Sequence, residues 1–531
     1  MILLPVILPV FTAVVILILS RTQPRFGVSY LVAMLVSLAN WSLVLAFHWI
    51  QPPPLALAEW LPIPGLPAAI IFQLDSVSWA YAFAITSLAA AVILTASARL
   101  ALRSIPTAWA GSLLVSGAAI LAIISGSPLA LALAWTIIDL IELAIILGTV
   151  NQPQMSLQAV LSFSARVTGT FFLIIAMAIS QSNGQVLILI DPPQASAILL
   201  LVAAGLRLGV LPLHLPYTAE VPLRRGLGTI LRLASPASSL VLLAHLPPNV
   251  VPASVYPFLL IFSALAGLYG AAMWAAAENE INGRPYWMIA LAGMCVASTI
   301  RGYPQSSLAW GTALILSGGI LFLYTARERL TGFPLALSLL AFTGLPFTPA
   351  ARGWYGLVIP PINVPDLIFL AAHALVMIGF IHHALRPADA LSTMERWIQV
   401  LYPLGLYLLA LASWLLLLLG LPDSLTSGVW WASLLSALIT LGYLVWYWRF
   451  RSRISTERFE KNWIVIVGRR AARMLGAVLR LDWLYRLLAA LLNLFQLFLR
   501  VITAILEGEG GILWIFVLLA LLLSLFRGAN P

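Results

Sequence analysis

Apolar runs of about 20 residues recur along the whole chain, separated by short segments rich in proline, glycine or arginine. A helix of that length crosses the ~30 Å hydrocarbon core of a bilayer at 1.5 Å per residue. The spacing of the runs predicts about sixteen transmembrane helices. Hydrophobic residues make up 62% of the chain, charged residues make up 9%, and the mean hydropathy is +1.02. We therefore expect an all-α polytopic membrane protein.

Two of the predicted spans contain residues that interrupt a helix. The segments are "LRLGVLPLHLPY" and "TGLPFTPA", and the residues are Gly209, Pro212, Gly344, Pro346 and Pro349. Proline removes a backbone donor, and the freed carbonyl must find another partner in lipid. The interrupted spans are the seventh and the twelfth, so they run in opposite directions. Such a pair indicates two inverted five-helix repeats, as in transporters; the alternative is that the prolines only bend their helices.

About fourteen core helices are expected, followed by a different C-terminal part. The predicted parts are helices 1–3 in residues 1–106, a first inverted bundle in 107–246, a second in 247–385, helices 14–15 in 386–448, an amphipathic lateral helix in 449–510 and a terminal transmembrane helix in 511–531. Asn493, Gln496 and Arg500 share one helix face, which is typical of a helix on a membrane surface or along partner helices. Alternatively, residues 485–506 form another span.

The formal net charge of +10 is distributed unevenly between the loops. Arginines are concentrated after odd-numbered spans, whereas the other loops are rich in proline. By the positive-inside rule, this pattern places the N-terminus outside and the lateral helix on the cytoplasmic side of a prokaryotic plasma membrane. Arg301 and Arg352 are the exceptions on the outer side. Membrane orientation thus accounts for the positive charge, and no nucleic-acid partner is predicted.

The chain offers little for cofactor chemistry. Cys295 is the single cysteine, so no iron–sulfur cluster, cysteine zinc site or internal disulfide can come from this chain's own cysteines. No glycine-rich phosphate loop follows a strand pattern. We predict no catalytic residue, no cofactor and no metal site, and any redox chemistry would belong to partner subunits.

Ionisable residues in the apolar runs carry the functional hypothesis. Asp139 and Glu142 lie one turn apart in span 5, Arg207 and His214 lie in span 7, and Arg232 lies in span 8. Each charged side chain at the bilayer centre costs ~3 kcal/mol of insertion free energy, so a stabilising partner or a function is expected for each. One reading is a proton path in which an acid holds the proton, the arginines tune it and His214 relays it. The other is a network of structural ion pairs, because arginine keeps its proton at physiological pH.

Two further residues are interpreted more simply. His373 in span 13 is either part of a second-half proton path or a hydrogen-bonded packing residue. Arg166 lies near the predicted inner end of span 6, where the side chain can extend to the membrane surface.

The ordered set of motifs resembles one family. The segments are "IIFQLDSVSWAYAF", "SPLALALAWTIIDLIEL", "SARVTGTFFLIIAMAI", "RLGVLPLHLPYTAEVPL" and "FTGLPFTPAARGW". They are similar to spans 3, 5, 6, 7 and 12 of the antiporter-like membrane subunits of respiratory complex I, membrane-bound hydrogenases and Mrp-type cation/proton antiporters. The surface helix followed by a last span resembles the lateral arm of the distal pumping subunit.

In that family a span 5 glutamate and lysines on spans 7, 8 and 12 carry the proton path. The resemblance gives Arg207 and His214 the places of the span 7 lysine and histidine, and Arg232 that of the span 8 lysine. The glutamate position falls on Thr136, so Asp139 and Glu142 would act as substitutes.

In the second half, the usual histidine and lysine become Leu314 and Gly318. The resemblance therefore implies a membrane-arm subunit of a complex I-like or hydrogenase-like assembly, and the substituted positions fit a degenerate channel. It implies other membrane subunits and the bilayer as partners and protons as cargo. Two alternatives remain open: an Mrp-like sodium/proton antiporter subunit and a non-conducting scaffold.

Overall fold

The computed structural model describes residues 1–22, 26–57, 69–98, 106–149, 153–214, 223, 225–386, 389–420 and 425–450, and the single positions 490, 493, 500, 516, 517, 519 and 520. The chain divides into two units, Met1–Ser455 and Thr456–Pro531. The predicted lateral helix and terminal span lie almost entirely outside the described residues.

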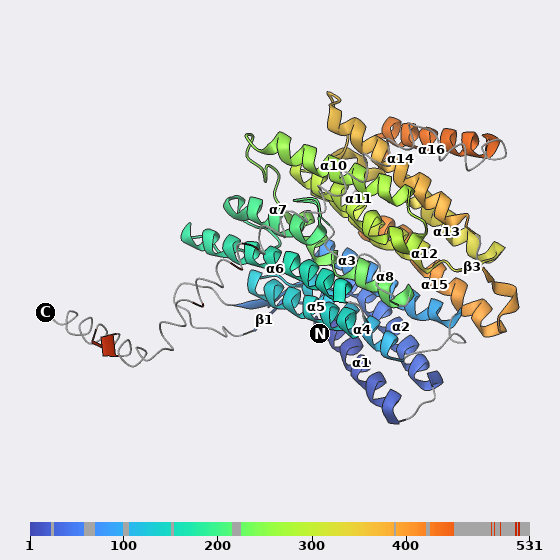
Figure 1. The fold of residues 1–531 in the computed structure, drawn as a ribbon, viewed down its shortest axis with the longest axis horizontal. Coiled ribbons are helices and arrows are strands. Elements are labelled where there is room, and N and C mark those ends of the chain that lie inside the picture. The colour runs from blue at the N-terminus through green and yellow to red at the C-terminus, as the bar shows by residue number, and fades with distance from the viewer. Residues whose placement is uncertain are drawn as a thin grey trace. The chain divides into compact units, whose positions relative to one another are not determined.

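Helices make up nearly all of the described part (Figure 1). They are α1 (Leu4–Thr22), α2 (Phe26–Ile50), α3 (Ser76–Thr95), α4 (Pro106–Ile123), α5 (Pro128–Thr149), α6 (Pro153–Ser182), α7 (Gln194–Leu208), α8 (Arg225–Ala234), α9 (Ala237–His245), α10 (Tyr256–Ala275), α11 (Glu280–Ile300), α12 (Pro304–Leu323), α13 (Arg329–Phe342), α14 (Val364–Ala384), α15 (Arg396–Leu415) and α16 (Trp430–Phe450). Within the described residues, twelve segments are long and apolar enough to cross a membrane. The prediction of an all-α polytopic membrane protein is confirmed.

Strands are confined to two short pairs in the described residues. Leu55–Leu57 (β1) pairs antiparallel with Ile70–Phe72 (β2), and Ala326–Arg327 (β3) pairs in parallel with Asp389–Ala390 (β4). Both pairs join loops at helix ends. They fix connections between spans and add no layer to the bundle.

The interior of the bundle is formed by α3, the α8–α9 segment, α11 and α12, and nearly every residue of α11 from Gly283 to Ile300 is buried. The spans of α3 and α8–α9 are wholly buried, and that of α12 is 94% buried. Helix α3 packs against α2, α4, α8, α9, α12 and α15. Its alanine- and serine-rich sequence "AYAFAITSLAAAV" allows this, because small side chains let neighbouring backbones approach closely.

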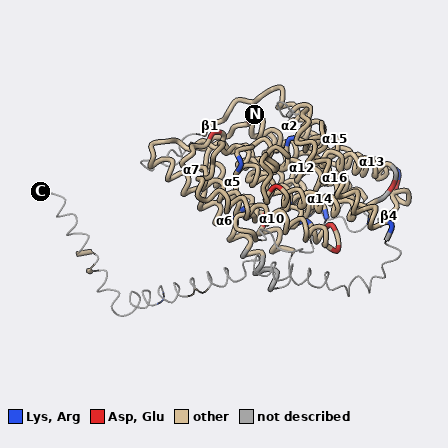
Figure 2. Tube along the Cα trace, turned by 90° about the horizontal axis from the view of Figure 1, so that it is seen from above, with Lys and Arg blue, Asp and Glu red and all other residues tan. Residues whose placement is uncertain are grey.

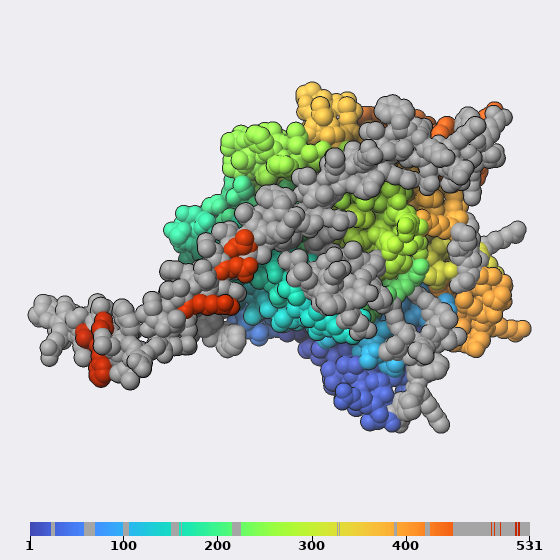
Figure 3. All heavy atoms as spheres, viewed as in Figure 1, coloured from blue at the N-terminus to red at the C-terminus, as the bar shows by residue number. Residues whose placement is uncertain are grey.

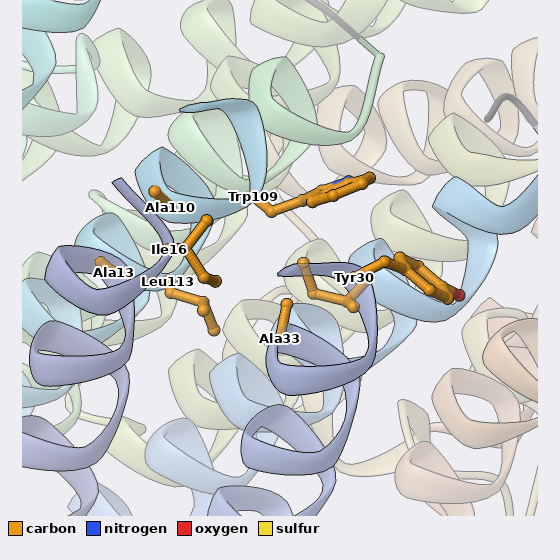
Figure 4. Close-up of a cluster of buried hydrophobic side chains, with 8 residues drawn as sticks. Ala13, Ile16, Tyr30, Ala33, Trp109, Ala110 and Leu113 are labelled. Atoms are coloured by element: carbon orange, nitrogen blue, oxygen red, sulfur yellow. The ribbon is translucent and has the colours of Figure 1, made fainter. Parts of the chain in front are cut away.

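The outer helices present apolar side chains outward. Only about a third of the α1, α2 and α6 spans is buried, and less of α16; Figure 3 shows the dark blue α1 at an edge of the packed helices. Charged residues are sparse over the described trace in Figure 2. On its inner side α1 contributes Ala13 and Ile16 to a buried cluster with Tyr30 and Trp109, whose rings lie 5.4 Å apart (Figure 4). This pattern fits lipid contact outside and close packing inside.

The two predicted interruptions coincide with helix ends. Helix α7 ends at Leu208, and Gly209 follows with a φ of +73°, a left-handed conformation that glycine adopts at low cost. Helix α13 ends at Phe342; Gly344, Pro346 and Pro349 lie in the irregular segment before a 3-10 turn at Ala351–Gly356.

A third interruption was not predicted. The eighth span consists of two helices, α8 and α9, which are separated at Ser235 and Pro236. Proline has no N–H to donate, so the regular hydrogen-bond ladder stops there. The break leaves Ser235 buried in the middle of the span.

One exception to the charge asymmetry has a structural reason. Arg301 follows α11, and its guanidinium forms an ion pair with Asp366 at the start of α14. Both side chains are buried, and Arg301 Nη1 also donates to the Leu357 carbonyl at 2.5 Å. Because its charge is neutralised locally, Arg301 does not weigh against the predicted orientation.

Candidate functional site

Asp139 and Glu142 lie side by side on the buried face of α5. Each is 1% exposed, whereas Thr136, Ile137 and Leu140 on the same helix are exposed. Residues three apart share a helix face, so the sequence spacing alone places both carboxylates toward the neighbouring helices. The carboxylates point away from the lipid-facing side of α5.

Asp139 is held by two arginines. Arg207 on α7 donates from Nη1 to Oδ2 at 2.7 Å and from Nη2 to Oδ1 at 2.8 Å, a bidentate arrangement. Arg166 on α6 donates from Nε to Oδ1 at 2.9 Å. The guanidinium of Arg207 also lies over the Trp135 ring, 4.3 Å from its centroid. The aspartate is therefore tied to α6 and α7 at once.

Arg166 links the two carboxylates. Its Nη2 lies 2.9 Å from Glu142 Oε2, while its Nε binds Asp139. Its backbone carbonyl accepts from Arg207 Nη1 at 3.2 Å. The predicted surface position of Arg166 is wrong: the side chain is 1% exposed, because two buried anions stabilise it better than the membrane surface would. The sequence did contain a signal for the burial of Arg166: two carboxylates one turn apart in a membrane span need a nearby cation.

Glu142 has a different partner on its second oxygen. The hydroxyl of Ser235 donates to Glu142 Oε1. This contact comes from the break between α8 and α9, so the unpredicted interruption supplies part of the site. Arg232, on α8 and 3% exposed, lies within electrostatic range of Glu142. The pairing of a span 5 acid with the span 7 arginine thus has a geometric basis.

His214 is placed differently from the predicted path. It lies in the segment after α7, is 2% exposed, and its Nδ1 contacts the Pro212 carbonyl oxygen at 2.8 Å. Its described hydrogen bond is local and does not reach Asp139 or Glu142. A relay role for His214 stays a prediction.

We call the four residues Asp139, Glu142, Arg166 and Arg207 the α5–α7 cluster. With Arg232 nearby, the region holds three guanidinium groups and two carboxylates, one more positive than negative charge when all are ionised. The arginines cannot lose a proton at physiological pH. Asp139 accepts three charged N–H groups, whereas Glu142 accepts only a neutral hydroxyl, at Oε1, and its Oε2 lies at ion-pair distance from Arg166 without a hydrogen bond. Glu142 is therefore the group that can take up a proton with the smaller loss of ion pairing.

The second half holds His373 in an aromatic pocket. The ring centroids of Trp310, Phe342 and Trp354 lie 5.3, 5.1 and 4.8 Å from its own. Nδ1 lies 2.7 Å from Ser436 Oγ and Nε2 lies 3.2 Å from the Phe342 carbonyl oxygen. A regular helix would satisfy that carbonyl with the N–H of residue 346, which is a proline. A neutral imidazole that donates from Nε2 and accepts at Nδ1 meets both contacts. This geometry favours a structural role.

Metal chemistry finds no support in the part of the chain that the structure describes. No three histidine, cysteine or acidic side chains lie there in an arrangement that could hold a metal ion.

The comparisons with known proteins bear on the fold. The sequence matches no protein-family model and no curated protein. A chain of the Mrp complex from Dietzia sp. DQ12-45-1b superposes with a TM-score of 0.67 and 17% identity, over 95% of this chain and 63% of that one. This chain thus spans less than two thirds of the Mrp chain.

Two other solved structures agree. A chain of an archaeal membrane-bound sulfane sulfur reductase, a respiratory membrane complex, has a TM-score of 0.63 and 12% identity, over 98% of this chain and 99% of that one. A chain of respiratory complex I from Thermus thermophilus has a TM-score of 0.57 and 16% identity, over 80% of this chain and 100% of that one. Together the three show that the chain has the fold of antiporter-like membrane subunits, as the sequence predicts.

Replacing Arg166 by leucine should destabilise the protein strongly, because it leaves two buried carboxylates short of a partner. The expected loss is about 3–5 kcal/mol, seen as a lower unfolding midpoint in lipid nanodiscs. Arg21→Leu, at an exposed helix end, is the matched control and should change little. Equal midpoints for the two variants would contradict the bridging role of Arg166.

Substitutions of His373 separate its two possible roles. His373→Gln keeps a donor for the Phe342 carbonyl and should retain most of the stability, whereas His373→Leu leaves that carbonyl buried and unpaired at a cost of about 1–3 kcal/mol. Both unfolding midpoints and ion transport by the folded variants should be measured. A well-folded His373→Gln protein that no longer transports ions would establish a proton path through the second half.

Proposed function

We propose that the chain is a membrane-arm subunit of a multi-subunit, proton-translocating complex and that its first half binds one exchangeable proton at Glu142. The single observation that supports this proposal is the α5–α7 cluster, a nearly solvent-free set of ion pairs in a chain with the antiporter-like fold. Buried ionisable groups in membrane spans are costly, and their commonest use is in ion pathways.

The proton chemistry follows from the partners of Glu142. When Glu142 is ionised, the Ser235 hydroxyl donates to Oε1 and Arg166 pairs with Oε2. On protonation at Oε1, the carboxyl becomes the donor and the serine oxygen accepts, since a hydroxyl can do either. Arg166 keeps its bond to Asp139, so the two arginines of the cluster still share an anion. The cluster can thus gain one proton without coming apart.

The arginines act on this proton through their fields. Arg207 is fixed by its bidentate bond to Asp139, and Arg232 lies near Glu142. Their positive charge favours release of the proton once it has bound. In the proposal Asp139 stays ionised and anchors the arginines, while Glu142 alternates between its two states.

Proton translocation would then be confined to the first half. The described interior of the second half is built around aromatic rings and His373, and the guanidinium carbon of its buried Arg284 lies 5.6 Å from the centroid of the Phe322 ring. Redox chemistry or another driving reaction would come from partner subunits, as the names of the respiratory complexes with this fold suggest.

Two other functions have specific support. A non-conducting scaffold is favoured by the pairing of Asp139 with two arginines, which is what a purely structural network requires. A sodium/proton antiporter subunit is favoured by the likeness to a chain of an Mrp complex. Sodium-dependent pH changes would distinguish this function from proton translocation alone.

Substitution of Glu142 by glutamine tests the proposed function directly. Proton uptake by membrane vesicles that carry the complex should fall by at least about tenfold, because the amide cannot bind the proton. Glu395→Gln, the same change at an exposed position, is the control and should transport normally. Asp139→Asn together with Glu142→Gln should also abolish uptake. Unchanged uptake in Glu142→Gln vesicles would leave the cluster structural and favour the scaffold.

Purification from native membranes tests the partnership. Solubilised in mild detergent, the tagged full chain should elute with other polytopic membrane subunits in a stable, defined ratio. Elution of the chain alone, with transport activity retained after reconstitution, would contradict assignment to a multi-subunit complex.

A further inference from the structure

A second ionisable pair lies at one end of the bundle, apart from the α5–α7 cluster. His245, the last residue of α9, places Nε2 2.8 Å from Oδ2 of Asp75, the residue that caps α3. Asp75 Oδ1 accepts from the Ser78 backbone N–H at 3.0 Å. The loops at this end, 51–74 and 246–255, contain no arginine, so it is the predicted outer end.

The pair has access to a cavity. A partly enclosed space of about 250 Å³ is lined by the end of α2, including His48 and Gln51, and by Asp75, Ser76 and Trp79. The Asp75 side chain is 22% exposed, whereas that of His245 is 7% exposed. The carboxylate thus faces the cavity and the imidazole lies behind it. A space of this size holds several water molecules.

The segment from Ser235 to His245 connects the proposed proton site at Glu142 with the outer pair. Ser235, at the break before α9, donates to Glu142. On α9, Ser238 accepts from Trp135 Nε1 at 2.8 Å, and the Ser239 hydroxyl is fully buried with no hydrogen-bond partner in the described part. A buried hydroxyl without a partner indicates a water site. His245 follows Ser239 by six residues, about 9 Å along the helix axis.

We infer that Asp75 and His245 form the proton-exchange site between the Glu142 region and the outer aqueous phase. The inference rests on the proposed function and adds to it the place where the proton leaves or enters. The hydroxyls of α9 and water beside them would carry the proton over the intervening distance.

The exchange step is balanced in protons and charge. In the resting pair the imidazole donates its Nε2–H to the Asp75 carboxylate, and Nδ1 holds a lone pair. A proton that binds Nδ1 forms an imidazolium, which the adjacent carboxylate stabilises. The imidazolium then gives one proton to water in the cavity, and the neutral imidazole is restored. No other reactant is needed.

The surroundings leave the imidazole as the exchanging group. Burial opposes ionisation of Asp75, but the His245 and Ser78 contacts outweigh it and keep the Asp75 pKa below its usual range. The carboxylate therefore stays charged at physiological pH. Ionisable side chains on the elements around the pair are His48 from α2, Asp191 before α7, Arg301 after α11 and Tyr303 before α12. Arg301 is neutralised by Asp366.

The direct test is a titration of His245 in the complex in nanodiscs, with ¹⁵N-labelled histidine and His245→Gln to assign its signal. If the imidazole exchanges the proton, its signal should respond to bulk pH, and Asp75→Asn should change that response because the neighbouring anion is lost. A signal that does not respond to pH, or a response that Asp75→Asn leaves unchanged, would overturn the inference.

Vesicle transport gives the second readout. His245→Gln keeps a donor for Asp75 but cannot bind a proton, so proton uptake should fall about tenfold or more and lose its dependence on outer pH. His382→Gln is the control: it is exposed and lies at the opposite end of the bundle, since α9 and α14 end on opposite faces in the predicted topology. If Glu142→Gln abolishes uptake while His245→Gln behaves as wild type, the exchange site is wrong and the proposed function stands. If Glu142→Gln leaves uptake intact, the proposed function fails, and the titration alone decides whether the pair binds protons.

Discussion

The bond between buried arginines and carboxylates on facing helices is the constraint on which the first half depends. Arg166 and Arg207 are almost free of solvent contact, and neither can discharge itself by losing a proton. Asp139 pairs with both, so three helices are held in one arrangement by one side chain. Removing any member leaves an unpaired charge in a low-dielectric interior, which costs more than the pair itself contributes. In the proposed function, Glu142 is the member of the cluster that gains and loses a proton.

The two halves solve the problem of a broken helix differently. In the first half, α7 ends at a left-handed glycine directly after Arg207, and a second break beside α8 directs Ser235 to the acid. In the second half, the carbonyl freed near Pro346 is satisfied by a neutral histidine among aromatic rings. The breaks in the first half thus lie beside charged side chains, whereas the break near Pro346 lies beside the His373 imidazole and aromatic rings. The proposed proton site lies in the first half, and the proposed structural role of His373 lies in the second.

The apolar runs and their punctuation predicted the helical architecture and both helix ends at glycine, because span length and proline chemistry are local properties. Helix periodicity predicted that Asp139 and Glu142 lie on the same face of α5. The burial of Arg166 could not be predicted in this way, since a side chain near a helix end can extend either to the membrane surface or to an interior anion. Only the three-dimensional packing decides between these two positions. The contact of Ser235 with Glu142 and that of His373 with the Phe342 carbonyl oxygen also depend on three-dimensional packing. No sequence pattern marks the serine or the carbonyl as a partner.

Infrared spectroscopy of the complex in lipid tests the central claim most directly, by recording the C=O stretch of a protonated carboxyl as pH is lowered. We predict that the wild-type spectrum contains one protonated-carboxyl band that the Glu142→Gln spectrum lacks at the same pH, and that this band grows with falling pH, shifts in D₂O and persists in Asp139→Asn. Wild-type and Glu142→Gln spectra that do not differ in this region, at any pH at which the protein stays folded, would show that Glu142 is not the exchangeable site.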